Sequence, residues 1–354
     1  MDSKLTSLEF TAGIKVGWNL GNTLDAGGTR DIMSEMSWGN PLTTEEMMLA
    51  VRDAGFNAVR IPVTWGNHMD EDHNIAGDWK ARVKQVVDYA YNNGLYVILD
   101  THHEKWNEPY ESNREAAAEI MKAAWTQIAE VFREYDERLI FEGMNEPRMV
   151  GTEFEWNGGN DEGHAVVNFL NQVFVDTVRA SGGNNARRFL MVSPYAASET
   201  RTALAALELP DDSADRLIVS VHSYTPNFFA QNTEINRAIM CESNKWRADD
   251  EACTRDIELL TKNLDELFIS KGTAVIVGEF GAVSKDNEEY RAEWVRYYLT
   301  KFKKLGIPCF IWDNGAFDVG EIFGLLDRHS CTWKFPRLMA GIMEGARADR
   351  CIKC

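Results

Sequence analysis

Residues 43–62, TTEEMMLAVRDAGFNAVRIP, contain a helix followed by a strand, and this unit decides the fold. Thr43 and Glu46 have the spacing of a capping box, which predicts the first turn of a helix. Apolar residues then recur at helical spacing at Met47, Val51 and Ala54. Gly55 is a typical helix terminator, and the apolar run 58–62 after it predicts a short buried strand.

The same order of an amphipathic segment, a glycine and a short apolar run recurs along the chain. With two further apolar runs, the expected strands are 14–17, 58–62, 96–99, 139–141, 189–192, 217–221, 274–277 and 308–312. Eight alternating βα units predict an α/β protein with a closed (β/α)8 TIM barrel. The alternative is a doubly wound open sheet, but residues 18–23, WNLGNT, lack its glycine-rich phosphate loop. No linker-like tract interrupts the series, so we expect a single catalytic barrel domain over residues 1–354.

The chain is strongly acidic, with 37 basic and 55 acidic residues and a formal net charge of −18. Such a surface repels nucleic acid and anionic lipid, so neither is expected as a partner. No apolar window is long enough to span a bilayer. Residues 1–5 lack a signal-peptide pattern, which leaves either a cytoplasmic protein or a trimmed mature chain.

Cysteine positions favour the second of these possibilities. Cys241 and Cys253 bracket a polar stretch that resembles an exposed loop, and Cys351 and Cys354 lie at the end of the chain. We favour a disulfide within each pair over zinc, because no second Cys-x-x-Cys completes four ligands. Disulfides indicate a secreted protein whose signal peptide is absent from this chain. Cys309, inside an apolar run, is expected to be buried.

Two glutamates follow apolar runs that are distant in the sequence. Glu146, in the tripeptide Asn-Glu-Pro, follows the run 139–141, and Glu279 follows the run 274–277. Strand ends on one rim of a parallel barrel converge in space, so the two side chains should meet there. A pair of carboxyl groups facing a sugar is the machinery of glycoside hydrolysis. We therefore interpret the rim as a glycosidase site.

Polar or aromatic side chains follow most of the other expected strands and should lie on the same rim. They are Asn19, Asn22, Asp25, Arg60, Trp65, His68, His102, His103, Asn145, His222, Tyr224 and Trp312. Taken singly, several have a purely structural interpretation: Arg60 could form a structural ion pair, and either histidine of the adjacent pair could belong to the core. Glu142 is most simply a buried, hydrogen-bonded strand residue. Because all of them are expected at the same end of the barrel, a functional site is favoured over these separate structural interpretations.

A metal centre is the competing use of such residues. Barrel metallohydrolases usually present two histidines on one strand with one residue between them. His102 and His103 are adjacent, so their side chains should point to opposite faces. His102, His222 and Glu279 could still meet at an ion, but Arg60 would then lie beside a cation. We therefore expect no metal and no cofactor.

Seven short motifs, spread from the first expected strand to the eighth, form an ordered set. They are GWNLGN (17–22), VRIP (59–62), DTHHE (100–104), NEP (145–147), HSY (222–224), GEFG (278–281) and IWD (311–313). This set resembles glycoside hydrolase family 5, the cellulase-type barrel enzymes, over essentially the whole chain. Within that family the sequence is most similar to the endo-β-1,4-glucanases of anaerobic bacteria and gut fungi.

The resemblance implies a retaining endo-β-1,4-glucanase acting on cellulose-like polysaccharide, with Glu146 as acid/base and Glu279 as nucleophile. Arg60 and Tyr224 would hydrogen-bond Glu279 and keep it ionised, while the pKa of Glu146 would be raised. The other residues implied for substrate binding or support are His102, His103, Asn145, His222, Trp312, Asn22, Asp25 and Trp38.

Three of these roles are more specific. Asn145 would hold the sugar 2-hydroxyl, and His222 would lie near Glu146. Trp312 would form the platform under the sugar before the scissile bond, and the resemblance implies a cis peptide between Trp312 and Asp313 to turn its indole into the cleft.

The tryptophans divide into two expected groups. Those in helical patterns should be core residues: Trp79, Trp125 and Trp294. Those in rim loops are candidates for stacking on sugar rings: Trp38, Trp65, Trp106, Trp156 and Trp246.

Several functional alternatives stay open from the sequence. The same chemistry could act on xyloglucan, mixed-linkage β-glucan, mannan or xylan, and a catalytically silent carbohydrate-binding barrel is a remote alternative. The expected partner is the polysaccharide itself. We expect a monomer, with carbohydrate-binding or docking domains that could be appended outside this chain.

Overall fold

The computed structural model, which describes residues 5–232 and 244–348, contains a closed parallel barrel of eight strands. Seven of them lie at the predicted runs, whereas the first begins at Gly17, where the predicted run 14–17 ends. The strands are β1 (Gly17–Asn19), β2 (Ala58–Ile61), β3 (Tyr96–Asp100), β4 (Leu139–Glu142), β5 (Leu190–Val192), β6 (Leu217–His222), β7 (Ala274–Phe280) and β8 (Cys309–Ile311). Each strand pairs in parallel with the next, and β8 returns to pair with β1. The predicted (β/α)8 barrel is therefore confirmed, and the open doubly wound sheet is excluded.

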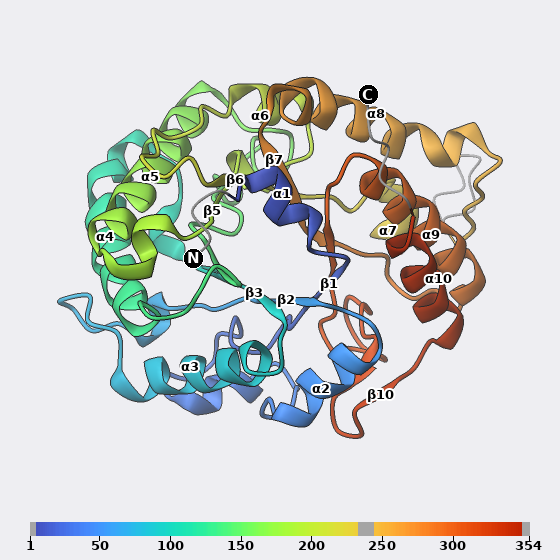
Figure 1. Ribbon diagram of the computed structural model, residues 1–354, viewed down its shortest axis with the longest axis horizontal. Coiled ribbons are helices and arrows are strands. Elements are labelled where there is room, and N and C mark those ends of the chain that lie inside the picture. Colours follow the sequence, from blue (N-terminus) through green and yellow to red (C-terminus); the bar gives the residue numbers. More distant parts are fainter. Residues whose placement is uncertain (1–4, 233–243, 349–354) are drawn as a thin grey trace.

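Helices alternate with the strands and form an outer ring (Figure 1). They are α1 (Ser7–Ala12), α2 (Glu45–Asp53), α3 (Gly77–Tyr91), α4 (Arg114–Val131), α5 (Asp161–Ala180), α6 (Arg201–Ala206), α7 (Asn227–Ala230), α8 (Glu251–Leu267), α9 (Glu288–Lys304) and α10 (Pro336–Ala346). Each connection between successive barrel strands contains at least one helix, and α10 follows β8. A small antiparallel pair, β9 (Leu326–Asp327) and β10 (Thr332–Trp333), precedes α10.

The start of α2 differs from its prediction in one respect. The helix begins at Glu45 with Thr44 as the N-cap, and no side-chain capping bond is present. The capping box predicted for Thr43 and Glu46 is therefore wrong. Thr43 instead belongs to the preceding loop, where its backbone N–H donates to Glu35 Oε1 at 2.7 Å.

The end of α2 and the start of β2 agree with the prediction from the sequence. Gly55 has φ +110°, a backbone conformation that side chains rarely adopt, and it terminates α2. The chain then enters β2 directly, where Ala58 pairs with Gly17 of β1 and Tyr96 of β3.

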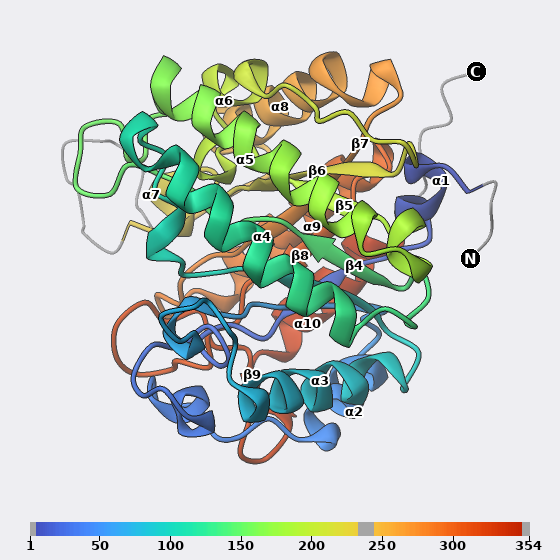
Figure 2. The ribbon, with the colours of Figure 1, turned by 90° about the vertical axis from the view of Figure 1, so that its left-hand side faces the viewer.

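Alternate residues of each strand face opposite sides of the barrel wall. On β3, Val97 and Leu99 pack in the cluster that the strands share with the surrounding helices, whereas Ile98 lies in the barrel interior. The interior cluster also contains Phe10 of α1, the helix that lies across the opening of the ring in Figure 1. Figure 2 shows α1 at the opposite end of the barrel from α7, so one end is covered and the other carries the long connections.

The interior positions nearest the C-terminal ends of the strands are polar. They are Asn19, Arg60, Asp100, Glu142 and Ser220, all fully buried. Glu142 is hydrogen-bonded as predicted, because its carboxylate accepts from Arg60 Nε at 2.6 Å and from Ser220 Oγ at 2.5 Å. A polar layer therefore separates the apolar core from the open rim.

The tryptophans divide less simply than the sequence suggests. The three predicted core residues are buried: Trp79, Trp125 and Trp294. Trp65 and Trp246 are also buried, so their interpretation as cleft residues is wrong. Each donates its indole N–H to a backbone carbonyl, which makes a polar-flanked tryptophan compatible with the core.

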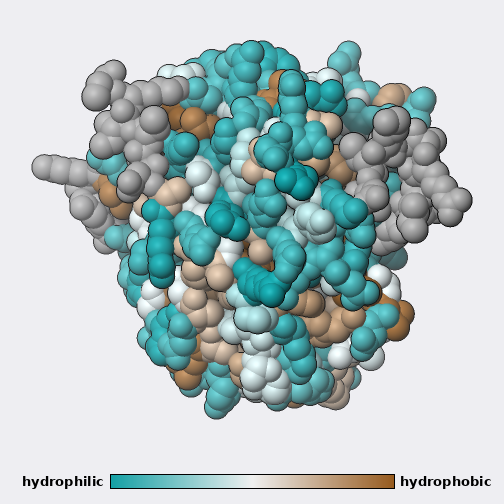
Figure 3. All heavy atoms as spheres, turned by 90° about the vertical axis from the view of Figure 1, so that its right-hand side faces the viewer, coloured by the Kyte–Doolittle hydropathy of each residue, from teal (hydrophilic) through white to brown (hydrophobic). Residues whose placement is uncertain are grey.

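The outer face of α8, α9 and α10 is mostly hydrophilic, with only scattered apolar side chains (Figure 3). Across the described residues, the helices are either too short or too polar to cross a bilayer. Cys309 is buried as predicted. Cys241, Cys351 and Cys354 lie outside the described residues, so both disulfide pairings stay predictions.

Candidate active site

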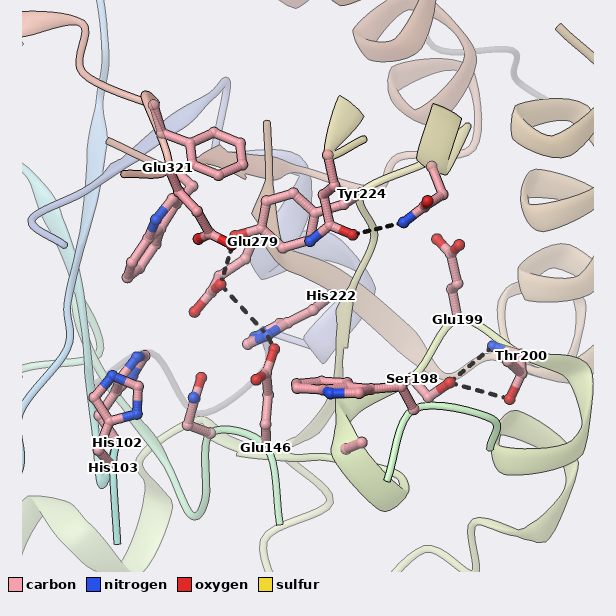
Figure 4. A pocket seen from close by; sticks show the side chains of 17 residues that line it. His102, His103, Glu146, Ser198, Glu199, Thr200, His222, Tyr224, Glu279 and Glu321 are labelled. Carbon is pink, nitrogen blue, oxygen red and sulfur yellow. Dashed lines mark hydrogen bonds and ion pairs between the residues drawn. The ribbon is translucent and has the colours of Figure 1, made fainter. Parts of the chain in front are cut away.

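Glu146 and Glu279 lie side by side at the open rim of the barrel. Glu279 is part of β7, whereas Glu146 lies in the loop that follows β4. With His222 at the end of β6, they place one donor atom each within 4.8 Å of one another. Figure 4 shows both carboxyl groups next to the His222 imidazole. The convergence predicted from two distant strand ends is thus present.

Arg60 connects Glu279 to the buried polar layer. Its guanidinium lies 2.7 Å from Glu279 Oε1, 2.6 Å from Glu142 Oε2 and 2.7 Å from Asp100 Oδ2. Burial lowers the pKa of Arg60, but the carboxylates of Glu142, Asp100 and Glu279 outweigh it, so the pKa is well above its usual value. Burial in turn raises the pKa of Asp100 to about 6, despite the neighbouring Arg60. Arg60 therefore has both of the roles considered for it. It forms buried ion pairs with Glu142 and Asp100, and the same guanidinium contacts Glu279 in the site.

Glu279 is held in its ionised form. Tyr224 donates its hydroxyl to Glu279 Oε2 at 2.8 Å. Burial raises the pKa of Glu279, but the charges of His222 and Arg60 outweigh it and leave the pKa below its ordinary value. Burial keeps the pKa of Tyr224 well above its usual value, so Tyr224 remains a donor.

Glu146 has a different partner. His222 Nδ1 lies 2.8 Å from Glu146 Oε1. Burial lowers the pKa of His222, but the charges of Glu279 and Glu146 and the bond to Glu146 leave it raised. Burial raises the pKa of Glu146, but the bond and charge of His222 leave it lowered. This direction is opposite to the raised pKa predicted for Glu146, because the neighbouring His222 favours the ionised carboxylate.

Asn145 is oriented by the same arginine. Arg60 Nη2 donates to Asn145 Oδ1 at 2.8 Å, and the backbone N–H of Asn145 donates to Thr101 at 2.9 Å. Because its carbonyl oxygen is engaged, the Asn145 amide presents its NH2 group to the cleft.

The rim opens into two adjoining cavities, of about 630 Å³ and about 540 Å³. His103 lines both of them. The predicted residues in the first cavity are His102, His103, Asn145, Glu146, His222, Tyr224, Glu279 and Trp312. Asp25 and Trp38 line the second. The site is therefore part of a longer groove.

His102 and His103 both face this groove, so the prediction that their side chains point apart is wrong. β3 ends at Asp100, and the alternation of a strand no longer applies beyond it. The two rings lie 4.4 Å apart, and their Nε2 atoms lie 4.0 Å and 3.9 Å from Asp25 Oδ2. Asp100 fixes His102 by accepting from Nδ1 at 2.7 Å. Burial lowers the pKa of His103 to about 4, which keeps its ring neutral.

Two indoles flank these histidines. The Trp312 ring is nearly parallel to His102, at an interplanar angle of 4° and a centroid distance of 5.9 Å. It packs on Gly21, where a Cβ atom would lie 2.7 Å from the indole, so a side chain there would displace it. The Trp38 ring lies 5.5 Å from that of His103 and is 44% exposed.

The peptide bond after Trp312 corrects one expectation. The Trp312–Asp313 bond is trans, and Thr225–Pro226 is the cis bond found in the described chain. The predicted cis bond is therefore wrong, and the indole reaches the cleft by packing on the β1 loop.

Asn22 differs from the other candidates. Its backbone has φ +55°, and its N–H donates to Asp25 Oδ2 at 3.0 Å. Within the described residues, its side chain is absent from the linings of both cavities. Asn22 thus positions Asp25 through its backbone, and its direct contact with substrate stays a prediction. Burial raises the pKa of Asp25 to about 6.

One wall of the first cavity was missed by the sequence reasoning. It contains Ser198, Glu199, Thr200, Asn227 and Gln231, next to the predicted Trp156. The polar run 198–200 follows the fifth strand and was the available signal. Trp156, a predicted cleft tryptophan, is 60% exposed. Burial raises the pKa of Glu199 to about 7.

Two groups of donor atoms among the described residues have spacings that a metal ion could bridge. They are Asp25, His102 and His103, and Glu146, His222 and Glu279. The trio considered from the sequence, His102, His222 and Glu279, mixes members of both groups. Arg60, 2.7 Å from Glu279, already supplies the positive charge at that carboxylate. The donor sets suit the hydroxyl groups of a sugar.

A family model described as cellulase (glycosyl hydrolase family 5) matches residues 24–318. The chain belongs to glycosyl hydrolase family 5. The resemblance read from the seven motifs is confirmed by this match, and the protein is a glycoside hydrolase.

Known endoglucanases match over nearly the full length. Endoglucanase A of Ruminococcus albus is 43% identical over 349 residues, covering 97% of this chain and 93% of that protein. A solved broad-specificity endoglucanase from Ruminococcus champanellensis with bound cellotriose has a TM-score of 0.91 and 43% identity, covering 96% of this chain and 98% of that one. A xyloglucan-specific endo-β-1,4-glucanase from a metagenomic library, in complex with cellotriose, has a TM-score of 0.89 and 42% identity, covering 95% and 98%.

Proposed function

We propose that the protein is a retaining endo-β-1,4-glucanase that cleaves internal bonds of cellulose-like polysaccharides by double displacement. The observation that carries this proposal is the pair Glu146 and Glu279, with carboxylate oxygens within 4.8 Å of each other. Retaining glycosidases place their carboxyl groups about 5–5.5 Å apart, whereas inverting enzymes need about 6.5–9.5 Å to admit water. One oxygen of each carboxyl group lies within 4.8 Å of the other, and this close approach supports the shorter separation of a retaining enzyme.

In the first step, Glu279 attacks the anomeric carbon and the glycosidic bond breaks. Arg60 and Tyr224 each hold one oxygen of Glu279, which aims the carboxylate and keeps it ionised. Glu146 gives a proton to the departing oxygen as general acid. His222, 2.8 Å from Glu146, supplies that carboxyl with its proton.

In the second step, water hydrolyses the glycosyl-enzyme bond to Glu279. Glu146 now acts as the base that takes a proton from the attacking water. Asn145, whose NH2 group faces the cleft, holds the sugar 2-hydroxyl through both steps, and Trp312 lies under the same sugar ring.

Substrate preference is the open part of this proposal. The structural relatives include both a broad-specificity endoglucanase and a xyloglucan-specific one. The adjoining cavities form a groove that continues beyond the catalytic pair, which supports action within a chain. We place unbranched β-1,4-glucan first, and xyloglucan, mixed-linkage β-glucan, mannan and xylan as alternatives.

The proposal also extends to the surroundings of the enzyme. An insoluble polysaccharide cannot enter a cell, so we propose that the protein acts outside it, where the predicted disulfides would persist. We further propose that residues 1–354 fold as one monomeric catalytic domain.

A reducing-sugar assay on a panel of β-glucans, xyloglucan, mannan and xylan tests the substrate. Proton NMR of the first product tests the stereochemistry, which should be β. A first product with the α configuration would refute the retaining mechanism. Inactivity on the whole panel, together with binding of β-glucan, would favour the silent carbohydrate-binding alternative.

A further inference from the structure

Arg148 is a second cation beside the acid/base carboxyl. Its Nη1 atom lies 3.5 Å from Glu146 Oε2 and donates to the Glu146 backbone carbonyl at 3.1 Å. His222 contacts the other carboxylate oxygen, Oε1. The two oxygens of Glu146 therefore face two different cationic side chains, one from β6 and one from the loop after β4.

The position of Arg148 is fixed by two neighbours in the same loop. Its guanidinium lies over the Trp156 ring at 4.2 Å from the centroid. Its Nε atom donates to Glu155 Oε1 at 3.2 Å, and the other oxygen of Glu155 accepts from the Gly151 backbone at 2.8 Å. The stack and the ion pair hold the long arginine side chain in one orientation.

This loop lies on one side of the catalytic pair. In Figure 4, Glu146 and Glu279 lie between His102 and His103 on one side and Ser198, Glu199 and Thr200 on the other. Gly158, two residues beyond Trp156, packs against Thr200. Trp312 and His102 mark the side of the attacked sugar, so Trp156 belongs to the side of the leaving group.

The proposed double displacement needs opposite states of Glu146 in its two steps. Glu146 must be protonated when the leaving group departs and ionised when water attacks. An adjacent guanidinium favours the ionised form. Trp156 is 60% exposed and lines the first cavity, so its ring is available to stack on a sugar while Arg148 packs against it.

We propose that Arg148 is a positioning residue that biases Glu146 toward its ionised form for the second step, and that Trp156 binds the sugar on the leaving-group side. This inference deepens the proposed function and rests on it. The charged and titratable groups around Glu146 include His222, Arg148, His103, Glu279 and Tyr224. Removing the guanidinium beside the Glu146 carboxylate takes away a positive charge, so the effect on Glu146 has a predictable sign.

The test is the pH profile of Arg148→Met. Loss of the positive charge should move the alkaline limb of kcat/KM upward by about one pH unit, because the acid form of Glu146 then persists to higher pH. With a dinitrophenyl cellobioside, whose leaving group needs no proton, the acid limb of kcat should also move upward by about one pH unit, because the second step needs ionised Glu146. Arg148→Lys should bring the alkaline limb back toward the parent position.

Trp156→Ala tests the second half of the proposal. The KM for long cello-oligosaccharides should rise about tenfold, while the KM for the aryl cellobioside, which lacks a leaving sugar, changes little.

The matched control for Arg148→Met is Arg114→Met. Arg114 also stacks on an aromatic ring, that of Phe169 at 4.7 Å, but it lines neither cavity and should change neither profile.

A purely structural role for Arg148 gives a different result. If Arg148→Met lowers activity equally at all pH values and leaves the alkaline limb in place, the residue only braces the loop and the proposal is wrong. NMR titration of the Glu146 carboxyl in the parent and in Arg148→Met decides the same point without substrate. An inactive parent would overturn the proposed function, whereas the titration would still decide the role of Arg148.

Discussion

Replacing Tyr224 with phenylalanine removes one of the two donors that hold the nucleophile Glu279. The Tyr224 hydroxyl lies 2.8 Å from Glu279 Oε2, and the Arg60 contact with Oε1 remains in the variant. A hydrogen bond to a charged group contributes about 1.5–3 kcal/mol, and one pKa unit corresponds to about 1.4 kcal/mol. Because the lost donor favours the ionised form, the pKa of Glu279 should rise by about 1–2 units.

The assay is the pH dependence of kcat/KM on a soluble aryl cellobioside. Its acid limb reports the ionisation of the nucleophile in the free enzyme, so in Tyr224→Phe this limb should move upward by about 1–2 pH units. Activity is then lost at a higher pH as the solution is acidified. Tyr297→Phe is the matched control, because Tyr297 also donates its hydroxyl to a carboxylate, that of Glu258, on the outer helices. An acid limb that stays in place while the rate falls uniformly would refute the reasoning and indicate that Tyr224 acts on the sugar.

Three further predictions concern the same site. Glu279→Gly should lower kcat about 10⁴-fold or more, which corresponds to about 5 kcal/mol of activation barrier. Glu146→Gly, assayed with an activated aryl cellobioside, should regain turnover when azide is added and should form a β-glycosyl azide. An α product from the Glu146 variant would mean that the two roles are exchanged. Arg60→Met should lower the free energy of unfolding by about 3–5 kcal/mol, because it leaves buried carboxylates without their cation. The control is Arg52→Met, which breaks an exposed ion pair with Asp53 and should lower it by less than about 1 kcal/mol in the same denaturant titration. Trp312→Ala should lower kcat/KM about 10²-fold through loss of sugar alignment, and an unchanged value would remove its role as a platform.

The barrel was predictable because its signal is repeated. Each βα unit carries its own helical spacing and apolar run, and an error at one end, such as the capping box at Thr43, does not change the topology. The catalytic pair was predictable for a similar reason, since strand ends on one rim converge whatever lies between them. The local sequence pattern therefore sufficed to predict the strands and the catalytic pair, because the geometry of a closed barrel brings the strand ends together.

The sequence failed where the outcome depended on loops and on charge balance. His102 and His103 lie just past the end of β3, so the alternation used to separate them does not apply. The state of Glu146 depends on how far His222 and Arg148 approach it, and no spacing along the chain encodes those distances. Trp65 and Trp246 are flanked by polar residues, yet they are buried, because each indole finds a backbone acceptor.

Arg60 places the reactive carboxylate in the same ionic network as the barrel interior. One guanidinium faces three carboxyl groups, so Glu279 adds negative charge to a region that already contains Glu142 and Asp100. Activity and stability therefore depend on the same charge. Because the pKa of Glu279 lies below its ordinary value, its ionised form stabilises the fold. Glu279→Gln should therefore lose activity and melt below the temperature of the parent protein. An enzyme of this design gains heat tolerance through its outer helices and loops, because the centre of the barrel is committed to keeping one glutamate charged.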